Sequence, residues 1–158
     1  MQSVAASVRD SIADLRNLMT DIYPASLHTS GLAAALGDLA TSNTGAPRIL
    51  LDLNDDAIAR LTTEQQDAAY RVAQEALRNA FRHADATTVV LRVTAVQGSR
   101  TVLEIDDDGF GFDVAAAATA VPEGHFGLSL MADTARAVGA GLIVRTSADG
   151  TTIRMEFS

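Results

Sequence analysis

The sequence contains no cysteine and no lysine among its 158 residues. The absence of cysteine excludes disulfide bonds, zinc–thiolate sites and cysteine nucleophiles. The absence of lysine excludes a P-loop, which needs a Gly-Lys-Ser/Thr sequence, and a protein kinase of the eukaryotic type, which needs a lysine on a strand. An acidic chain that binds a phosphate group must do so locally, for example with backbone amides, a few arginines or a metal ion.

Aromatic residues and positive charges are also scarce. Only 4% of the residues are aromatic while 47% are hydrophobic, so the core must be built from Ala, Val, Leu and Ile. The net charge of −8 argues against non-specific nucleic-acid binding, which needs a basic face, and we expect no nucleic-acid partner. No apolar run approaches the ~20 residues of a membrane span, and no secretory signal opens the chain. We expect a cytoplasmic domain, whether or not the whole protein is anchored in a membrane.

Apolar periodicity and turn signals predict a pair of helices followed by mixed strands and helices, with hairpins. The predicted helices are Ser3–Tyr23, Gly31–Ala40, Thr63–His83 with Thr62 or Thr63 as its N-cap, and Phe126–Val138. The predicted strands are Ile49–Leu53, Thr88–Val96, Arg100–Asp106, Leu142–Thr146 and Thr151–Phe157, the last four forming two hairpins. This pattern indicates an α+β fold, a sandwich of one mostly antiparallel sheet with helices on one face.

The long helix carries a polar stripe of Glu75, Asn79, Arg82 and His83, which fall within roughly a third of its circumference. One interpretation is a solvated face without further function. Asparagine is a poor residue inside a helix, however, because its side chain competes for backbone hydrogen bonds. A glutamate and an asparagine one turn apart are reasonable ligands for a hydrated Mg²⁺ ion.

An acidic cluster, Asp106-Asp107-Asp108, ends the strand before Gly109 and Gly111. It could be an acidic turn or a site for a divalent metal. Strand alternation places Asp107 on the same face as Leu103, towards the core. A buried carboxylate is costly unless it has a partner, and the amino group of a purine would be one. The two glycines would let a base approach the backbone.

A second glycine motif precedes the next predicted helix, where Gly124 and Gly127 bracket His125-Phe126. Free amides at a helix N-terminus bind phosphate, although such a motif alone is weak evidence. The three histidines of the chain do not have metal-ligand spacing, and no cysteine supports them.

Taken together and in this order, the motifs resemble the catalytic ATP-binding domain of a bacterial sensor histidine kinase. Gln74–Ala84 resembles the N box of the nitrate/nitrite-sensor subfamily, and Asp107–Gly111 and Gly124–Met131 resemble its two glycine boxes. Asp149–Ile153 resembles the closing glycine-threonine box. The superfamily is that of the Bergerat-fold ATPases, shared with DNA gyrase, heat-shock chaperones of the ninety-kilodalton type and mismatch-repair proteins.

The resemblance covers essentially the whole chain and implies its organisation. Residues 1–25 would be a stub of the dimerisation helix and linker, and residues 26–158 the ATP-binding kinase domain. This domain would donate the γ-phosphoryl group of Mg-ATP to a histidine on a separate dimerisation domain, and a response regulator would then receive it. The subfamily's acceptor box, a histidine beside an acidic residue, is not found here, so the chain looks like a fragment of a kinase that is a homodimer when complete. We expect the fragment to be monomeric, because the single helix Ser3–Tyr23 supplies only part of a dimerising bundle.

The resemblance also implies roles for single residues. Asp107 would accept a hydrogen bond from the adenine amino group, with Thr151 or Thr152 nearby. Asn79 would hold Mg²⁺, and Glu75 would lie near the γ-phosphate, where it would orient a water or help to activate the acceptor histidine. The other implied binding residues, which face the phosphates or shape the pocket, are Arg82, His83, Gly109, Gly111, Gly124, His125, Gly127 and Leu128.

Two alternatives stay open at this point. One keeps the fold and changes the reaction to that of an anti-sigma-factor-type serine kinase. The other is a nucleotide-sensing module without transfer chemistry, which would not need Glu75.

Overall fold

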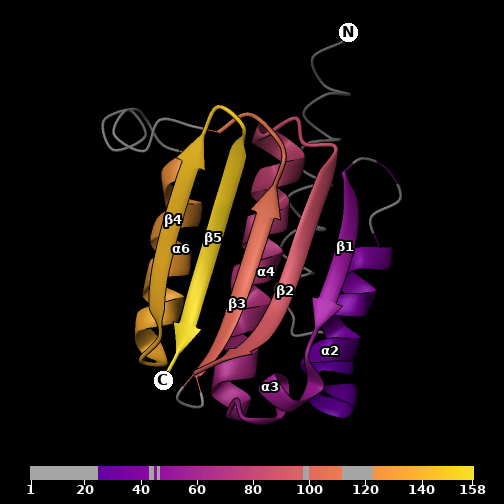
Figure 1. The fold of residues 1–158 in the computed structure, drawn as a ribbon, viewed down its shortest axis with the longest axis vertical. Helices are drawn as coiled ribbons and strands as arrows, with labels where there is room; N and C mark the ends of the chain where they lie inside the picture. The colour runs from indigo at the N-terminus through magenta and orange to yellow at the C-terminus, as the bar shows by residue number, and fades with distance from the viewer. Residues whose placement is uncertain (1–24, 43–44, 46, 98–99, 112–122) are drawn as a thin grey trace, which may run out of the picture.

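The computed structural model describes residues 25–42, 45, 47–97, 100–111 and 123–158. The helix expected at Ser3–Tyr23 and most of the alanine-rich connection before the second glycine motif lie outside these ranges. The described elements, shown in Figure 1, are α2 (Ala25–Thr41), β1 (Arg48–Leu53), α3 (Asp55–Ala59), α4 (Thr63–His83), β2 (Thr88–Val96), β3 (Arg100–Asp107), α6 (Glu123–Ala137), β4 (Gly141–Ser147) and β5 (Gly150–Phe157).

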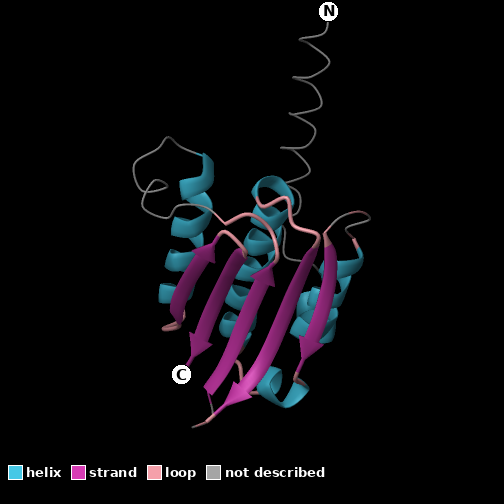
Figure 2. Cartoon of the chain, turned by 45° about the horizontal axis from the view of Figure 1, so that its top comes forward, coloured by secondary structure: helices cyan, strands magenta, loops and turns pink. Residues whose placement is uncertain are grey.

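The five strands form one mixed sheet in the order β1-β2-β3-β5-β4. Only β1 and β2 pair in parallel, and the other neighbours are antiparallel. The helices α2, α4 and α6 lie behind the sheet in Figure 1, and the turned view of Figure 2 leaves the opposite face open. The expected sandwich of a mostly antiparallel sheet with helices on one face is therefore confirmed. None of the described helices is both long and apolar enough to cross a membrane.

Helix α4 begins and ends where the sequence predicts. Thr62 is its N-cap: the hydroxyl of Thr62 accepts from the amide of Gln65 at 3.2 Å, and the Gln65 side chain accepts from the amide of Thr62 at 3.0 Å. This reciprocal capping box satisfies two amides that lack helical partners. Arg82 and His83 in the last turn are placed favourably for the helix dipole.

Three helices differ from the prediction. Helix α2 starts at Ala25 and continues across Gly31, whose φ of 82° and ψ of 178° break the helical backbone. Helix α3 is too short to show apolar periodicity and was not predicted, although Asn54 caps it by accepting from the amide of Ala57 at 2.9 Å. Helix α6 starts at Glu123 instead of Phe126, so the second glycine motif lies inside the helix and not in a loop before it.

The core lies between the covered face of the sheet and the helices. Small side chains on α4 let this helix approach the sheet closely. Strands β2 and β5 alternate between buried and partly exposed residues, so one side of each faces the core. Fully buried side chains of this core include Ala69, Ala73, Leu91, Leu103, Met131, Met155 and Phe157.

Candidate nucleotide site

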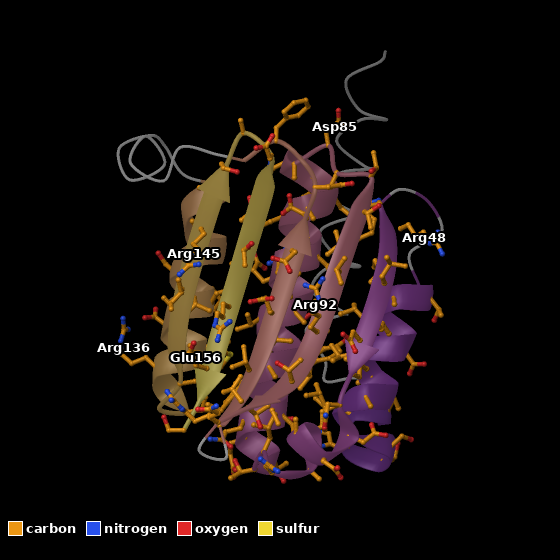
Figure 3. All side chains as sticks on the ribbon, viewed as in Figure 1. Arg48, Asp85, Arg92, Arg136, Arg145 and Glu156 are labelled. Atoms are coloured by element: carbon orange, nitrogen blue, oxygen red, sulfur yellow. The ribbon has the colours of Figure 1, made fainter. Side chains whose placement is uncertain are left out.

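The predicted motifs meet at one end of the sheet, the upper end in Figure 1, where β3 ends beside the C-terminal end of α4. The amide of Phe110 donates to the carbonyl of Ala84, directly after α4, at 2.7 Å. Asp85 then takes a left-handed conformation with φ of 48°, at the upper edge in Figure 3. The bond between Phe110 and Ala84 attaches the turn after β3 to the end of α4.

Asp107 is the last residue of β3 and pairs in register with Thr151 of β5. It is half-buried, and its Oδ1 accepts from the amides of Gly109 at 3.1 Å and Thr151 at 3.2 Å. Burial raises the pKa of Asp107, and these two amide bonds oppose the rise. The predicted orientation of Asp107 towards the covered face is therefore confirmed.

Asp108 is exposed and fixes the turn to the start of β2. Its Oδ1 accepts from the amides of Thr87 and Thr88, each at 2.8 Å, and its Oδ2 accepts from the Thr87 hydroxyl at 2.6 Å. These bonds, the Thr87 hydroxyl first among them, hold the pKa of Asp108 below its usual value.

Asp106 points to the open face of the sheet. It forms an ion pair with Arg92 and accepts from the hydroxyl of Thr152 at 2.6 Å. The three adjacent aspartates thus have three separate environments, and the described residues contain no cluster of three His, Cys, Asp or Glu suited to a metal. The same geometry separates the two candidate threonines, because Thr152 faces away from Asp107 while Thr151 donates to it.

The glycines of the turn pack against backbone. A Cβ at Gly109 would overlap the carbonyl oxygen of Ala84, and a Cβ at Gly111 would overlap that of Ser147. A Cβ at Gly150 would overlap the carbonyl oxygen of Asp107. The sequence predicts that Gly109 and Gly111 leave room for a base, but at both positions the space beside the Cα is filled by the protein's own backbone.

Glu75, Asn79 and Gly127 come together where α4 contacts α6. A Cβ at Gly127 would overlap Oε1 of Glu75 and would lie 3.4 Å from Nδ2 of Asn79. Glu75 is buried, with 6% of its surface exposed, and Asn79 is partly buried. Glu75 also forms an ion pair with Arg78, three residues along the helix.

The remaining predicted residues lie around this contact. Arg82 and His83 are exposed in the last turn of α4, and Gly124 and His125 are in the first turn of α6, where the structure describes only the course of the backbone. Leu128 is partly buried and packs against the core.

Two features of this end of the molecule were not predicted from the sequence. The ion pair of Arg78 with Glu75 has the i, i+3 spacing of helix ion pairs, so the sequence did contain a signal for it. The bonds of Asp108 with Thr87 and Thr88 join residues 20 and 21 positions apart, and no local pattern indicates them.

Comparison with known proteins gives one consistent result. Residues 64–158 match the family model of the histidine kinase-, DNA gyrase B-, and HSP90-like ATPases. An uncharacterized sensor-like histidine kinase of Chloroflexus aurantiacus is 31% identical over 130 residues, which cover 80% of this chain and 22% of that protein. The nitrate/nitrite sensor protein NarQ of Escherichia coli is 29% identical over 161 residues, covering 99% of this chain and 27% of NarQ.

A solved structure supports the same fold. The histidine kinase domain of the blue-light activated histidine kinase EL346 from Erythrobacter litoralis superposes with a TM-score of 0.65 at 21% identity, covering 80% of this chain and 60% of that one. The chain spans only 22% and 27% of the length of the two relatives above, so it corresponds to one part of such proteins. The chain belongs to the family of histidine kinase-, DNA gyrase B- and HSP90-like ATPases.

Proposed function

We propose that this chain binds Mg-ATP and transfers its γ-phosphoryl group to a histidine on the dimerisation domain of a sensor kinase. A response regulator would then receive the group. Family membership supports ATP as the nucleotide. The observation that carries the proposal is the half-buried Asp107, which ends β3 where the following turn contacts the end of α4, the helix that carries Glu75 and Asn79.

Asp107 would recognise adenine. Its Oδ1 receives two backbone amides, and a carboxylate has acceptor sites for more bonds than these. A hydrogen bond from the adenine amino group would offset the cost of burial that raises the pKa of Asp107. Thr151, buried and in register with Asp107, would complete this side of the pocket.

Asn79 would hold the Mg²⁺ ion. The side-chain oxygen of Asn79 fits such an ion, because Mg²⁺ prefers oxygen ligands. The ion keeps several waters and takes other ligands from phosphates, so it does not need several carboxylates around it. When bound, the ion would neutralise charge on the phosphates. Arg82 and His83, both exposed beside Asn79 on α4, would add donors for the phosphates, and the first-turn amides of α6 at Gly124 and His125 would do the same.

Glu75 would act at the transferred group. A nitrogen of the acceptor imidazole would form a bond to the γ-phosphorus while the bond to the β–γ bridging oxygen breaks, and ADP would leave with that electron pair. The proton on the other imidazole nitrogen would pass to Glu75, directly or through water. Catalysis would rest mainly on positioning and charge stabilisation, as in phosphoryl transfer generally.

Two experiments test this proposal. Calorimetric titration with ATP and ADP, with and without Mg²⁺, should give saturable binding to a monomeric chain. Incubation with γ-labelled ATP and a separate dimerisation segment carrying an acceptor histidine should then give acid-labile label on that segment. Acid-stable label on a serine-bearing partner would indicate the serine-kinase reaction instead, and binding without any transfer would indicate a nucleotide-sensing module.

A further inference from the structure

The carboxylate of Glu75 is an ionisable group that is buried and closely packed. Its side chain is only 8% exposed, between α4 and α6. A buried carboxylate without a partner is costly, and the structure provides a partner on one side and close packing on the other.

Arg78 is the partner. It lies one turn further along α4, its side chain is 40% exposed, and its Nη2 pairs with Oε2 of Glu75. The guanidinium group therefore reaches from the solvent side to an inward-facing carboxylate, and it fixes one of the two carboxylate oxygens.

Gly127 provides the close packing. The position of its missing Cβ overlaps Oε1 of Glu75 and lies 3.2 Å from the Cδ atom of that residue. The third neighbour is Nδ2 of Asn79, so all three nearest atoms belong to side chains and none to the backbone. A methyl group at position 127 would therefore push the Glu75 carboxylate aside and leave the two helices in place.

We propose that Arg78 and Gly127 are positioning residues, which together hold the Glu75 carboxylate in one orientation between α4 and α6. This inference rests on the proposed role of Glu75 in phosphoryl transfer. Neither residue needs to touch the reacting atoms: Arg78 holds Oε2, and Gly127 leaves the space that Oε1 occupies. Small displacements of a catalytic group lower rates strongly, so both residues should affect the rate of transfer more than the affinity for nucleotide.

The first test is a double-mutant cycle with Gly127→Ala and Glu75→Ala, measured as the rate of transfer to the dimerisation segment at saturating Mg-ATP. Gly127→Ala alone should lower kcat by roughly 10- to 100-fold and weaken ADP binding by a much smaller factor. In the Glu75→Ala background, Gly127→Ala should cause no further loss. Gly37→Ala is the matched control, because Gly37 is a helical glycine with nothing within 4 Å of its missing Cβ.

The second test separates the charge of Arg78 from its bulk. Arg78→Gln should lower kcat while leaving KM for ATP nearly unchanged, and Arg78→Lys should restore most of the rate, because lysine keeps the positive charge. Arg136→Gln is the control, since it removes an i, i+3 ion pair with Asp133 in which both side chains are exposed. Normal kcat in both Gly127→Ala and Arg78→Gln would overturn the positioning role.

A third measurement does not depend on activity. Arg78→Gln should lower the equilibrium constant for folding, measured by urea unfolding, by about tenfold or more, because it leaves Glu75 buried and unpaired. The same change in a Glu75→Gln background should cost much less. Equal losses in the two backgrounds would overturn the inference, whether or not the chain transfers phosphate. Absence of transfer by the parent chain, with the coupling intact, would refute the proposed function alone.

Discussion

Two aspartates on opposite faces of strand β3 have the same side chain but different partners. On the covered face, Asp107 follows the buried Leu103 and Ile105, and the bonds described for its carboxylate come from backbone amides. On the open face, Asp106 has an arginine as its partner. The residues are adjacent in sequence, and only the alternation of the strand separates them.

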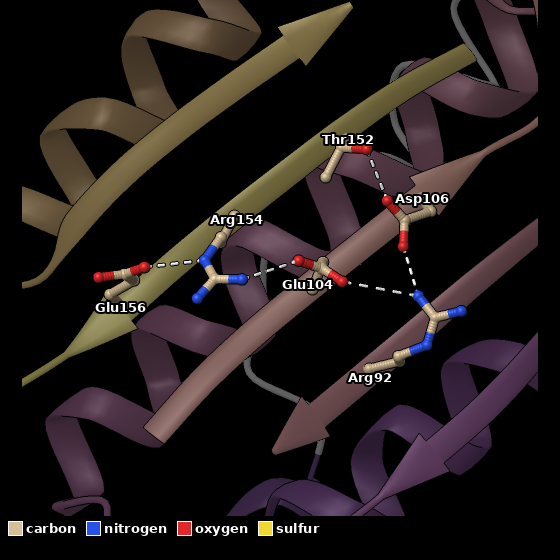
Figure 4. Close-up of polar contacts among 6 residues, drawn as sticks. All are labelled: Arg92, Glu104, Asp106, Thr152, Arg154 and Glu156. Carbon is tan, nitrogen blue, oxygen red and sulfur yellow. Dashed lines mark hydrogen bonds and ion pairs between the residues drawn. The ribbon is translucent and has the colours of Figure 1, made fainter. Parts of the chain in front are cut away.

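The open face is a ladder of compensated charges across β2, β3 and β5, drawn in Figure 4. Arg92 contacts Asp106 and lies 3.6 Å from Glu104, while Arg154 lies 3.2 Å from Glu104 and 2.8 Å from Glu156. Figure 3 shows Arg92, Arg145 and Glu156 on this side of the sheet. Each carboxylate of the ladder has its positive partner within the protein.

The difference between the partners of Asp106 and Asp107 indicates which carboxylate is available to a ligand. Asp106 is paired with Arg92, whereas within the described part of the chain the bonds to the Asp107 carboxylate come from two backbone amides, and its pKa is raised by burial. A carboxylate paired with an arginine contributes to the structure. A half-buried carboxylate that has no charged partner among the described residues is a candidate for ligand binding. The contrast between the two aspartates therefore supports the covered end of β3 as the nucleotide site.

The largest effect should come from filling the space beside Gly109. Gly109→Ala would place a methyl group against the carbonyl oxygen of Ala84, so the turn must separate from the end of α4. We expect a loss of about 3 kcal/mol in the free energy of unfolding, together with weakened nucleotide binding. Urea unfolding measures the first, and a variant as stable as the parent would show that this close packing is not required.

Removal of the side-chain amide of Asn79 should weaken the part of ATP binding that depends on Mg²⁺. Asn79→Ala should leave ADP binding without metal unchanged and reduce the additional affinity for ATP in Mg²⁺ by about 2 kcal/mol, which is on the order of a hydrogen bond to a charged group. Paired titrations with and without Mg²⁺ measure this difference. If the increment equals that of the parent, Asn79 is not the metal ligand.

On the open face, the loss of one ladder arginine should be mild. Arg154→Gln should cost no more than about 1 kcal/mol of stability, because its side chain is 35% exposed and surface ion pairs contribute little. The difference from the parent should shrink in high salt, and ATP binding should not change. A large loss of ATP affinity would mean that the two faces are not independent.

The smallest expected effect concerns pH. Because the folded-state pKa of Asp107 is raised above 3.8, its contribution to stability is present below the unfolded pKa and is lost as pH rises through the folded value. Asp107→Asn keeps an oxygen for the amides of Gly109 and Thr151 but carries no charge. Its stability relative to the parent should therefore increase slightly as pH rises above 3.8 and then level off. Urea unfolding at several pH values tests this, and a relative stability that falls with rising pH would contradict the sign.

Local sequence patterns predicted the features that depend on residues close together in the chain, such as helix caps and the alternation of a strand. The N-cap signal at Thr62 or Thr63 and the apolar period of α4 predicted the extent of that helix, and strand alternation predicted the orientation of Asp107. The resemblance to sensor kinases indicated the family, and the family match over residues 64–158 confirms it.

Contacts between distant segments could not be predicted in this way. The attachment of Asp108 to Thr87, and the packing of Gly109 against Ala84, depend on how α4, β2 and β3 meet in space. The pairing of Arg78 with Glu75 follows a known helical spacing, but the burial that makes this pair important arises from the packing of α6 at Gly127.

The most direct test of the assignment of Asp107 is calorimetric titration of ATP and ADP into two matched variants, Asp107→Asn and Asp106→Asn. Both change one carboxylate to an amide at adjacent positions of β3. Asp107→Asn should lose roughly 1–3 kcal/mol of binding free energy, because an acceptor oxygen facing the adenine amino group becomes a donor. Asp106→Asn should bind both nucleotides as the parent does. Undiminished binding by Asp107→Asn, or an equal loss in both variants, would contradict the adenine-binding role of Asp107.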